Sequence, residues 1–177
     1  MRVFVSIDIS NNEIINSIKN FQDSIKVDAK AIESKNFHFT LQFLGEISEK
    51  KVQVIINEFK KIEFLKFKIY LKGIGVFPNS KSPKIIWIGT DEKSSAKMID
   101  LSKKIQKSLG SLGFTPDKSF KPHITVFRIK KKIGDISKEM EIHEKINFGI
   151  QEVSSFKLKK SELTPNGPIY SDLMEFN

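Results

Sequence analysis

Three stretches of the chain repeat hydrophobic residues at every third or fourth position, a spacing that predicts amphipathic helices. They cover residues 10–26, 48–62 and 92–112. Ser10 and Glu13 form a capping-box pattern at the start of the first stretch. Gly113 directly follows the third stretch and is expected to end that helix.

The remaining apolar stretches read as β-strands, because apolar and polar residues alternate in them or short apolar runs occur. The expected strands are residues 2–9, 37–44, 64–76, 84–90, 122–129, about 151–161 and 168–176. Several of these are joined by short loops, which favours antiparallel pairing over a parallel doubly wound sheet. The pattern predicts an α+β fold. Each half of the chain offers a long helix and a similar strand, which suggests two similar lobes facing each other across a cleft.

Two of the expected strands carry the same tripeptide pattern, His-x-Thr, as His38-Phe39-Thr40 and His123-Ile124-Thr125. Side chains at positions i and i+2 of a strand point to the same face. Each motif therefore places one imidazole beside one hydroxyl. The chain has three histidines, and two of them fall in this arrangement.

Strict alternation assigns a face to each residue around these motifs. The apolar residues expected to face the core are Phe37, Phe39, Leu41 and Phe43 in the first strand, and Ile124 and Val126 in the second. The residues expected on the opposite face are His38, Thr40 and Gln42, and His123, Thr125 and Phe127. The second set is where a functional site is predicted.

A pair of histidines with hydroxyl neighbours suits acid–base cleavage of a phosphate ester. In-line displacement at phosphorus needs a base on one side and an acid on the other, which two facing strands can supply. Histidine fits both roles because its pKa of about 6.5 lies near working pH. The threonine hydroxyls would hold the phosphate. The pattern leaves open which histidine is the acid, and the alternative is a half-buried polar strand face without catalysis.

Other residues near the motifs allow weaker inferences. Arg128 could hold a phosphate, but strict alternation puts it on the face opposite His123 unless the strand bends. Trp87 is expected in the core and His143 on the surface. A metal site is disfavoured, because neither motif has a third ligand at convincing spacing.

The length, net charge and cysteine content of the chain indicate its domain number, its partner and its location. The chain has 177 residues, a length that fits one domain over residues 1–177. A net charge of +9 favours a polyanionic partner such as RNA. There is no cysteine, which fits a reducing, cytoplasmic location, and no apolar run long enough to span a bilayer.

The motifs and their flanks resemble the 2H phosphoesterase superfamily, and most closely the RNA 2′,3′-cyclic phosphodiesterases, formerly called 2′-5′ RNA ligases. The resemblance covers nearly the whole chain, through residues 2–8, 36–46, 75–78, 86–89, 120–128, 161–163 and 167–170. It implies a bilobal, pseudo-two-fold fold of two antiparallel sheets flanked by helices, with a central cleft. It also implies hydrolysis of an RNA terminal 2′,3′-cyclic phosphate to a 2′-phosphomonoester, without metal or other cofactor.

Within that resemblance, His38 matches the proton donor and His123 the proton acceptor. Thr40, Thr125 and Arg128 match the residues that bind the substrate phosphate. The expected partner is RNA with a cyclic phosphate end, for example a transfer-RNA fragment, acted on by a cytoplasmic monomer that does not bind membranes. Two alternatives remain, which are 2′-5′ RNA ligation at the same site and a module that binds RNA ends without catalysis.

Overall fold

The computed structural model describes residues 1–116 and 118–177. In this part of the chain four α-helices occur, together with a short 3₁₀ helix at Ser34–Asn36. The α-helices are α1 (Asn12–Ser24), α2 (Glu49–Phe59), α3 (Glu92–Gly110) and α4 (Ser137–His143). No helix among the described residues is long and apolar enough to cross a membrane.

Nine strands of the described chain form one antiparallel sheet in the order β7-β4-β5-β6-β3-β1-β8-β9, with β2 beside β6. The strands are β1 (Arg2–Asp8), β2 (Lys30–Ala31), β3 (His38–Glu46), β4 (Phe67–Phe77), β5 (Ile85–Thr90), β6 (Ile124–Arg128), β7 (Asn147–Val153), β8 (Phe156–Thr164) and β9 (Gly167–Phe176). The predicted α+β class with antiparallel pairing is confirmed.

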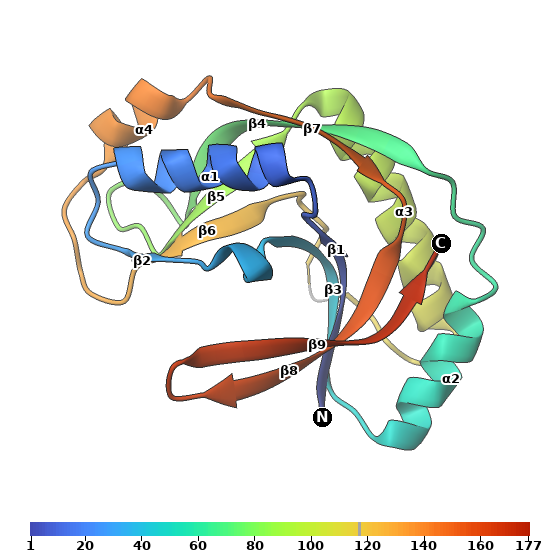
Figure 1. Ribbon diagram of the computed structural model, residues 1–177. Coiled ribbons are helices and arrows are strands. Elements are labelled where there is room, and N and C mark those ends of the chain that lie inside the picture. Colours follow the sequence, from blue (N-terminus) through green and yellow to red (C-terminus); the bar gives the residue numbers. More distant parts are fainter. Residues whose placement is uncertain (117) are drawn as a thin grey trace.

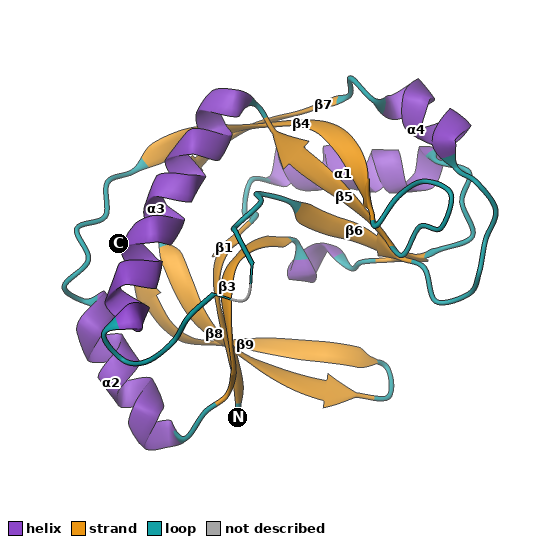
Figure 2. Cartoon of the chain, turned by 180° about the vertical axis from the view of Figure 1, so that it is seen from behind, coloured by secondary structure: helices purple, strands orange, loops and turns teal. Residues whose placement is uncertain are grey.

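The sheet has two halves that meet at β3 and β6, and the halves form the two lobes seen in Figures 1 and 2. The sequence predicted two sheets. The structure joins them through a single backbone pair, Phe39 with Ile124, so the strands form one strongly bent sheet. Each of these residues directly follows a motif histidine. The join therefore places His38 and His123 close to the boundary between the lobes.

The two halves repeat the same local order of elements. In one half β1 pairs antiparallel with β3, and the chain between these strands forms α1 and the short β2. In the other half β5 is followed by α3 and then by β6, which pairs antiparallel with β5. Each His-x-Thr motif thus lies at the start of the equivalent strand, which agrees with the predicted pseudo-two-fold arrangement.

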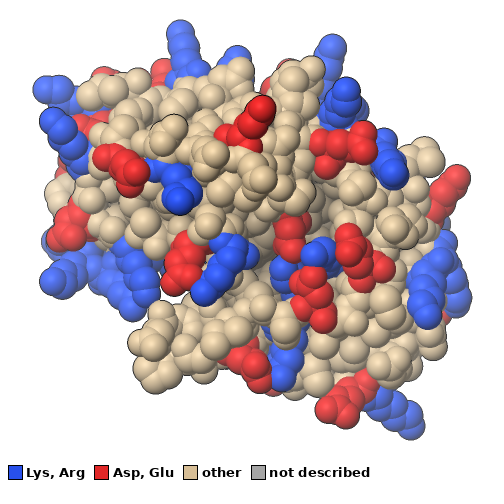
Figure 3. All heavy atoms as spheres, viewed as in Figure 1, with Lys and Arg blue, Asp and Glu red and all other residues tan. Residues whose placement is uncertain are grey.

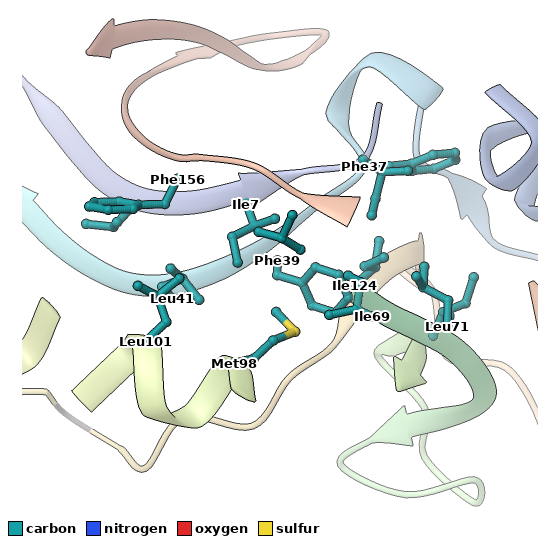
Figure 4. Packing of buried hydrophobic residues seen from close by; sticks show 14 of the residues in the cluster. Ile7, Phe37, Phe39, Leu41, Ile69, Leu71, Met98, Leu101, Ile124 and Phe156 are labelled. Carbon is teal, nitrogen blue, oxygen red and sulfur yellow. The ribbon is translucent and has the colours of Figure 1, made fainter. Parts of the chain in front are cut away.

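A continuous hydrophobic core lies beneath the join (Figure 4). Phe39 and Ile124 are both fully buried and pack there with Ile7, Ile69 and Met98. Helices α2 and α3 pack together, and α3 contacts strands β3 and β4. Core packing thus fixes the two motif strands relative to one another.

The start of α1 differs from the capping-box prediction. Asn11, not Ser10, is the N-cap, because its Oδ1 accepts hydrogen bonds from the backbone N–H groups of Glu13 and Ile14. The Ser10 N–H donates instead to the Gln151 side-chain oxygen. Ser10 is thus bonded to Gln151, a residue distant in sequence, and the helix is capped one residue later than predicted.

The C-terminal region also differs from its predicted elements. The run 151–161 was read as one strand, but β7 ends at Val153 and β8 starts at Phe156. The pattern did not predict α4 or the two-residue strand β2. Both are short, and a seven-residue helix spans too few turns to establish a periodic apolar face.

Candidate active site

Strand β3 contains a bulge immediately after its motif. Opposite β1, Ser6 pairs with Thr40 whereas Val5 pairs with Gln42, so Leu41 is an extra residue. The bulge reverses the alternation that follows. Gln42, predicted on the site face, is buried, and Phe43, predicted in the core, is 74% exposed.

Strand β6 contains a bulge at the equivalent position. Opposite β5, Trp87 pairs with Thr125 whereas Ile86 pairs with Phe127, so Val126 is the extra residue. Phe127, predicted on the site face, is therefore buried. Arg128, which strict alternation put on the far face, lies instead on the same side of the sheet as Thr125.

The two bulges bring residues at equivalent positions of β3 and β6 to the site. Each lies three residues after its histidine, and each brings the residue five positions after the histidine to the motif face. That residue is Phe43 in β3 and Arg128 in β6. One lobe thus contributes an aromatic ring where the other contributes a guanidinium.

Both histidines are held in the same tautomer. His38 Nδ1 donates to the Asn36 carbonyl oxygen at 2.7 Å, and His123 Nδ1 donates to the Lys121 carbonyl oxygen at 2.7 Å. A carbonyl oxygen can only accept, so Nδ1 carries the proton in each ring. The Nε2 atoms are left for chemistry, and His38 Nε2 lies 3.1 Å from Thr40 Oγ1.

A cavity of about 640 Å³ lies between the lobes and is lined by both motifs. We call it the histidine cavity. Its motif residues are His38, Thr40, His123, Thr125 and Arg128. The five residues that the sequence proposed as catalytic or phosphate-binding therefore border one space, whereas Gln42 and Phe127 do not line it. The β8–β9 hairpin supplies part of the opposite wall, including Tyr170.

Basic side chains border the same cavity. Lys30, Lys35 and Lys130 line it, and the Lys30 ammonium also donates to the Asn166 carbonyl oxygen of the β8–β9 turn. Figure 3 shows basic side chains gathered near β2, whose residues Lys30 and Ala31 line the cavity. An anionic substrate would be attracted to this edge.

Aromatic rings surround His38. Its ring centroid lies 5.3 Å from that of Phe4 and 5.3 Å from that of Tyr170. Burial among these rings lowers the pKa of the His38 imidazole. The hydrogen bond to Asn36 and the carboxylate of Asp8 oppose that shift and raise the pKa, while the positive charges of Lys159 and Arg128 lower it.

His123 has a different charge environment. Burial lowers the pKa of its imidazole, and the positive charges of Lys121 and Arg128 lower it further, while the hydrogen bond to the Lys121 carbonyl raises it. No acidic group is among the causes of this shift. The two motifs are nearly identical in sequence, but their electrostatic surroundings are not.

The acidic neighbour of His38 is fixed by an ion-pair network. Asp8 pairs across the ladder with His38, and its carboxylate lies 2.7 Å from the Lys159 ammonium. Lys159 is only 7% exposed and also contacts Asp172 at 3.1 Å. Lys157 bridges the same two carboxylates. Asp8 is thus held beside the imidazole.

Trp87, predicted in the core, is instead half-buried beside His123. Its ring centroid lies 6.2 Å from that of His123, and Phe77 packs edge-on against the same imidazole at 5.1 Å. A Cβ at Gly75 would overlap the indole, so only glycine leaves room for Trp87 in this orientation. The Lys121 ammonium lies 5.3 Å from the Trp87 ring.

His143, predicted on the surface, is half-buried. Its side chain is 16% exposed and packs edge-on against Phe21 in the lobe core, at 5.3 Å between ring centroids. It does not line the histidine cavity. His143 therefore belongs to the packing of α4 and not to the site.

Sequence reasoning missed Asp8, Phe4 and Tyr170 as neighbours of His38. Asp8 and Phe4 lie in β1 and Tyr170 in β9, and no motif connects these strands to β3. The one available signal was that all three fall within stretches that support the family resemblance. No group of three or more His, Asp or Glu side chains that could hold a metal ion occurs in residues 1–116 and 118–177.

The chain is similar to known proteins over almost its full length. Residues 2–174 match the family model described as AKAP7 2'5' RNA ligase-like domain. An RNA 2',3'-cyclic phosphodiesterase of Archaeoglobus fulgidus is 39% identical over 178 residues, which cover 99% of each chain. One of Methanocaldococcus jannaschii is 39% identical over 182 residues, covering 99% of this chain and 100% of that protein.

Solved structures show the same fold. TT0787 of Thermus thermophilus superposes with a TM-score of 0.84 at 26% identity, over 99% of this chain and 97% of that chain. E. coli LigT complexed with 3'-AMP superposes with a TM-score of 0.79 at 23% identity, over 99% and 96% of the two chains.

Proposed function

The chain belongs to the RNA 2′,3′-cyclic phosphodiesterase family of 2H phosphoesterases, and we propose that it hydrolyses an RNA terminal 2′,3′-cyclic phosphate to a 2′-phosphomonoester. One observation carries the proposal. Two histidines from adjacent strands, one in each lobe, line a single cavity, and each has its Nδ1 proton held by a carbonyl oxygen. This arrangement leaves two Nε2 atoms for proton transfer to and from one phosphate.

The proposed reaction is an in-line displacement. His123 Nε2 accepts a proton from water as the water oxygen bonds to phosphorus. The bond between phosphorus and the ribose 3′ oxygen breaks, and that oxygen takes a proton from His38 Nε2. Thr40 and Thr125 donate hydrogen bonds to the non-bridging oxygens, and Arg128 offsets their negative charge.

The charges around the two imidazoles support these roles. A general acid must hold its proton, and Asp8 opposes the lowering of the His38 pKa by burial, Lys159 and Arg128. A general base must be neutral, and the positive charges of Lys121 and Arg128 lower the pKa of His123. The negative phosphate would raise the pKa of both rings on binding, and Asp8 would still act on His38 alone.

Turnover of adenosine 2′,3′-cyclic phosphate tests the proposal directly. We expect adenosine 2′-monophosphate as the product, without the 3′ isomer, because the 3′ oxygen is the leaving group; phosphorus NMR resolves the two. A chelator should leave the rate unchanged. Unchanged cyclic nucleotide would favour a module that binds RNA ends. Joined RNA ends with a 2′-5′ linkage would favour a ligase.

We expect the pH dependence of kcat/KM to be bell-shaped, with its optimum on the acidic side of about 6.5. The rate rises as pH increases through the pKa of His123 and falls as pH increases through the pKa of His38. Burial lowers both pKa values in the free protein. A profile that keeps rising above about pH 8 would contradict these assignments.

Asp8→Asn should shift only one limb of that profile. Asp8 raises the pKa of His38, so its loss should move the alkaline limb to lower pH and leave the acid limb, set by His123, in place. Asp23→Asn in α1 removes the same charge from an exposed position and should shift neither limb. Movement of the acid limb alone in Asp8→Asn would reverse the acid and base assignments.

We further propose that the chain acts as one domain and as a monomer on RNA ends in the cytoplasm. One copy contains both motifs in one cavity, which supports a monomeric site and is testable by sedimentation equilibrium.

The net charge of +9 and the lysines at the cavity support an RNA partner. Transfer-RNA fragments are supported by family resemblance alone, and sequencing RNAs that lose a cyclic end in the protein's presence would test them.

A further inference from the structure

Two cations lie directly opposite one another in the sheet, Lys30 in β2 and Arg128 in β6. Opposite residues of an antiparallel pair carry their side chains on one face with Cβ atoms about 5 Å apart, and like charges at that spacing destabilise the pair. Both side chains line the histidine cavity. The repulsion thus lies in the wall of the cavity, where a bound anion would relieve it.

Neither cation is neutralised by a carboxylate that the structure describes. In residues 1–116 and 118–177, neither Lys30 nor Arg128 takes part in an ion pair. The Lys30 ammonium donates instead to the Asn166 carbonyl oxygen at 3.1 Å, in the turn between β8 and β9. This acceptor is neutral, and a phosphate oxygen would accept a stronger, charge-assisted hydrogen bond from Lys30.

The opposite end of the site offers less unpaired positive charge. A neighbouring cavity of about 460 Å³ also borders His38, and its Lys and Arg side chains are Arg2 and Arg128. Arg2 lies 3.5 Å from the Glu46 carboxylate and is therefore partly neutralised. At the β2 end Lys130 lines the histidine cavity together with Lys30. Figure 1 shows β2 and the turn between β8 and β9 on the same side of the molecule. An anionic chain is thus attracted more strongly toward β2.

The position of Lys30 suits the phosphate that comes next along an RNA chain. The proposed reaction places the first phosphate between the two imidazoles, with Arg128 beside it. The next phosphate is joined to the 5′ oxygen of the same ribose, one nucleotide away. Lys30 is the cation next to Arg128 in the sheet, and its long side chain carries the charge to the opposite wall of the cavity. Its charge is therefore separated from the first phosphate but remains within the same cavity.

We propose that the β2 end of the histidine cavity is a second phosphate subsite, where Lys30 binds the phosphodiester that joins the terminal nucleotide to the rest of the RNA. The proposal rests on the proposed function, because the two histidines define which phosphate is the first. A cyclic mononucleotide lacks the second phosphate and leaves Lys30 bonded to Asn166. The subsite therefore makes RNA ends better substrates than free cyclic mononucleotides.

The test adds only the second phosphate to the substrate. Adenosine 2′,3′-cyclic phosphate lacks it, and adenosine 5′-phosphate 2′,3′-cyclic phosphate carries it. We expect the unaltered protein to have the higher kcat/KM on the substrate with both phosphates. Lys30→Met keeps most of the side chain but removes the charge, and should lower the ratio of the two kcat/KM values by roughly 5- to 30-fold, as expected for one partly exposed charge-assisted hydrogen bond. Lys30→Arg keeps the charge and should keep most of the preference.

Lys131→Met is the matched control, because Lys131 is exposed, lies close to Arg128 in the chain and does not line the cavity. It removes the same charge from the protein, and the ratio should stay near that of the unaltered protein. An equal fall in Lys131→Met would mean diffuse attraction and would overturn the subsite. An unchanged ratio in Lys30→Met, or an unaltered protein that does not favour the second phosphate, would overturn it as well.

Salt dependence provides a second readout on an RNA oligonucleotide with a cyclic end. The logarithm of kcat/KM should fall with the logarithm of the salt concentration, because phosphate contacts release counterions. Lys30→Met should make that slope shallower by about 0.7, the value for one phosphate of a single strand. An unchanged slope would contradict a phosphate contact at Lys30.

Equilibrium binding separates failure of the subsite from failure of the proposed function. Adenosine 2′,5′-bisphosphate should bind the unaltered protein more tightly than adenosine 2′-monophosphate, and Lys30→Met should remove most of that advantage. If the unaltered protein turns over neither cyclic substrate, the proposed reaction is wrong, and the two binding constants then decide the subsite on their own. Equal affinity for the two nucleotides would overturn the subsite even where hydrolysis proceeds as proposed.

Discussion

His123→Ala is expected to slow hydrolysis of a 2′,3′-cyclic nucleotide by roughly 100- to 10,000-fold, and His38→Ala by a similar factor. Each replacement removes one of the two Nε2 atoms that border the histidine cavity. Removal of His123 takes away the imidazole proposed to accept the proton from water, and removal of His38 takes away the imidazole proposed to protonate the leaving oxygen. Steady-state turnover of adenosine 2′,3′-cyclic phosphate measures both losses.

The two variants, His38→Ala and His123→Ala, should differ in how strongly their rates depend on the leaving group of the substrate. A substrate whose leaving oxygen is a good leaving group, such as an aryl phosphodiester, needs little help from an acid. It should recover much of the rate in His38→Ala and little in His123→Ala. The opposite pattern would exchange the two roles, and full activity in either variant on the nucleotide would refute the two-histidine mechanism.

His143→Ala provides the matched control for both variants. It removes the third histidine of the chain, which packs on Phe21 and does not line the histidine cavity. Turnover should stay near that of the unaltered protein, although some stability is lost with the packing. Circular dichroism and thermal unfolding should show that the His38 and His123 variants remain folded.

The motif residues were predictable because they precede the bulges. Alternation places His38 and Thr40, and His123 and Thr125, on one face correctly, since each pair lies before the extra residue of its strand. It fails immediately afterwards, where Phe43 was assigned to the core. A bulge changes the register without changing the apolar pattern, so the pattern could not reveal it.

The sequence contains one sign of the bulge in β6, which is Arg128. Arg128 follows Ile124 and Val126 at the spacing that predicts a core position, yet a guanidinium in the core would be unpaired and costly. Such a conflict between residue type and predicted face is a reason to expect a break in the strand. Phe43 gave no such sign, because phenylalanine fits a core position.

The long helices were predictable because their apolar faces are long enough to be seen in the sequence. The acidic neighbour of His38 was not, because Asp8 reaches it through pairing between β1 and β3 and is fixed by Lys159 from β8. That arrangement depends on segments far apart in the chain, since Asp8 and Lys159 alone are separated by 151 residues. Only tertiary structure shows why two nearly identical motifs differ in charge environment.

Phe39→Ala is expected to lower the free energy of unfolding by about 3–5 kcal/mol. Phe39 is fully buried at the single backbone pair that joins the two halves of the sheet, where it packs with Ile124. Alanine there leaves a cavity among rigid neighbours. For a protein of this size the melting temperature should fall by roughly 6–20 °C, measured by calorimetry or circular dichroism.

Phe43→Ala is the matched control, since it makes the same chemical change four residues away on an exposed ring. Its effect on unfolding should stay within about 0.5 kcal/mol. The two variants thus compare the loss of a buried ring with the loss of an exposed ring within one strand. Equal destabilisation by both would contradict the assignment of Phe39 to the core and Phe43 to the cavity rim.

Phe39→Ala should also lower turnover at temperatures where the protein is still folded. Phe39 and Ile124 directly follow the two histidines, so a shift at their pair changes the separation of the two imidazoles. A displacement of about 1 Å can cost about 100-fold in rate when acid and base act on one phosphate. Full turnover in folded Phe39→Ala would mean that other contacts fix the lobes, because the pair that joins the two halves would then not determine the catalytic geometry.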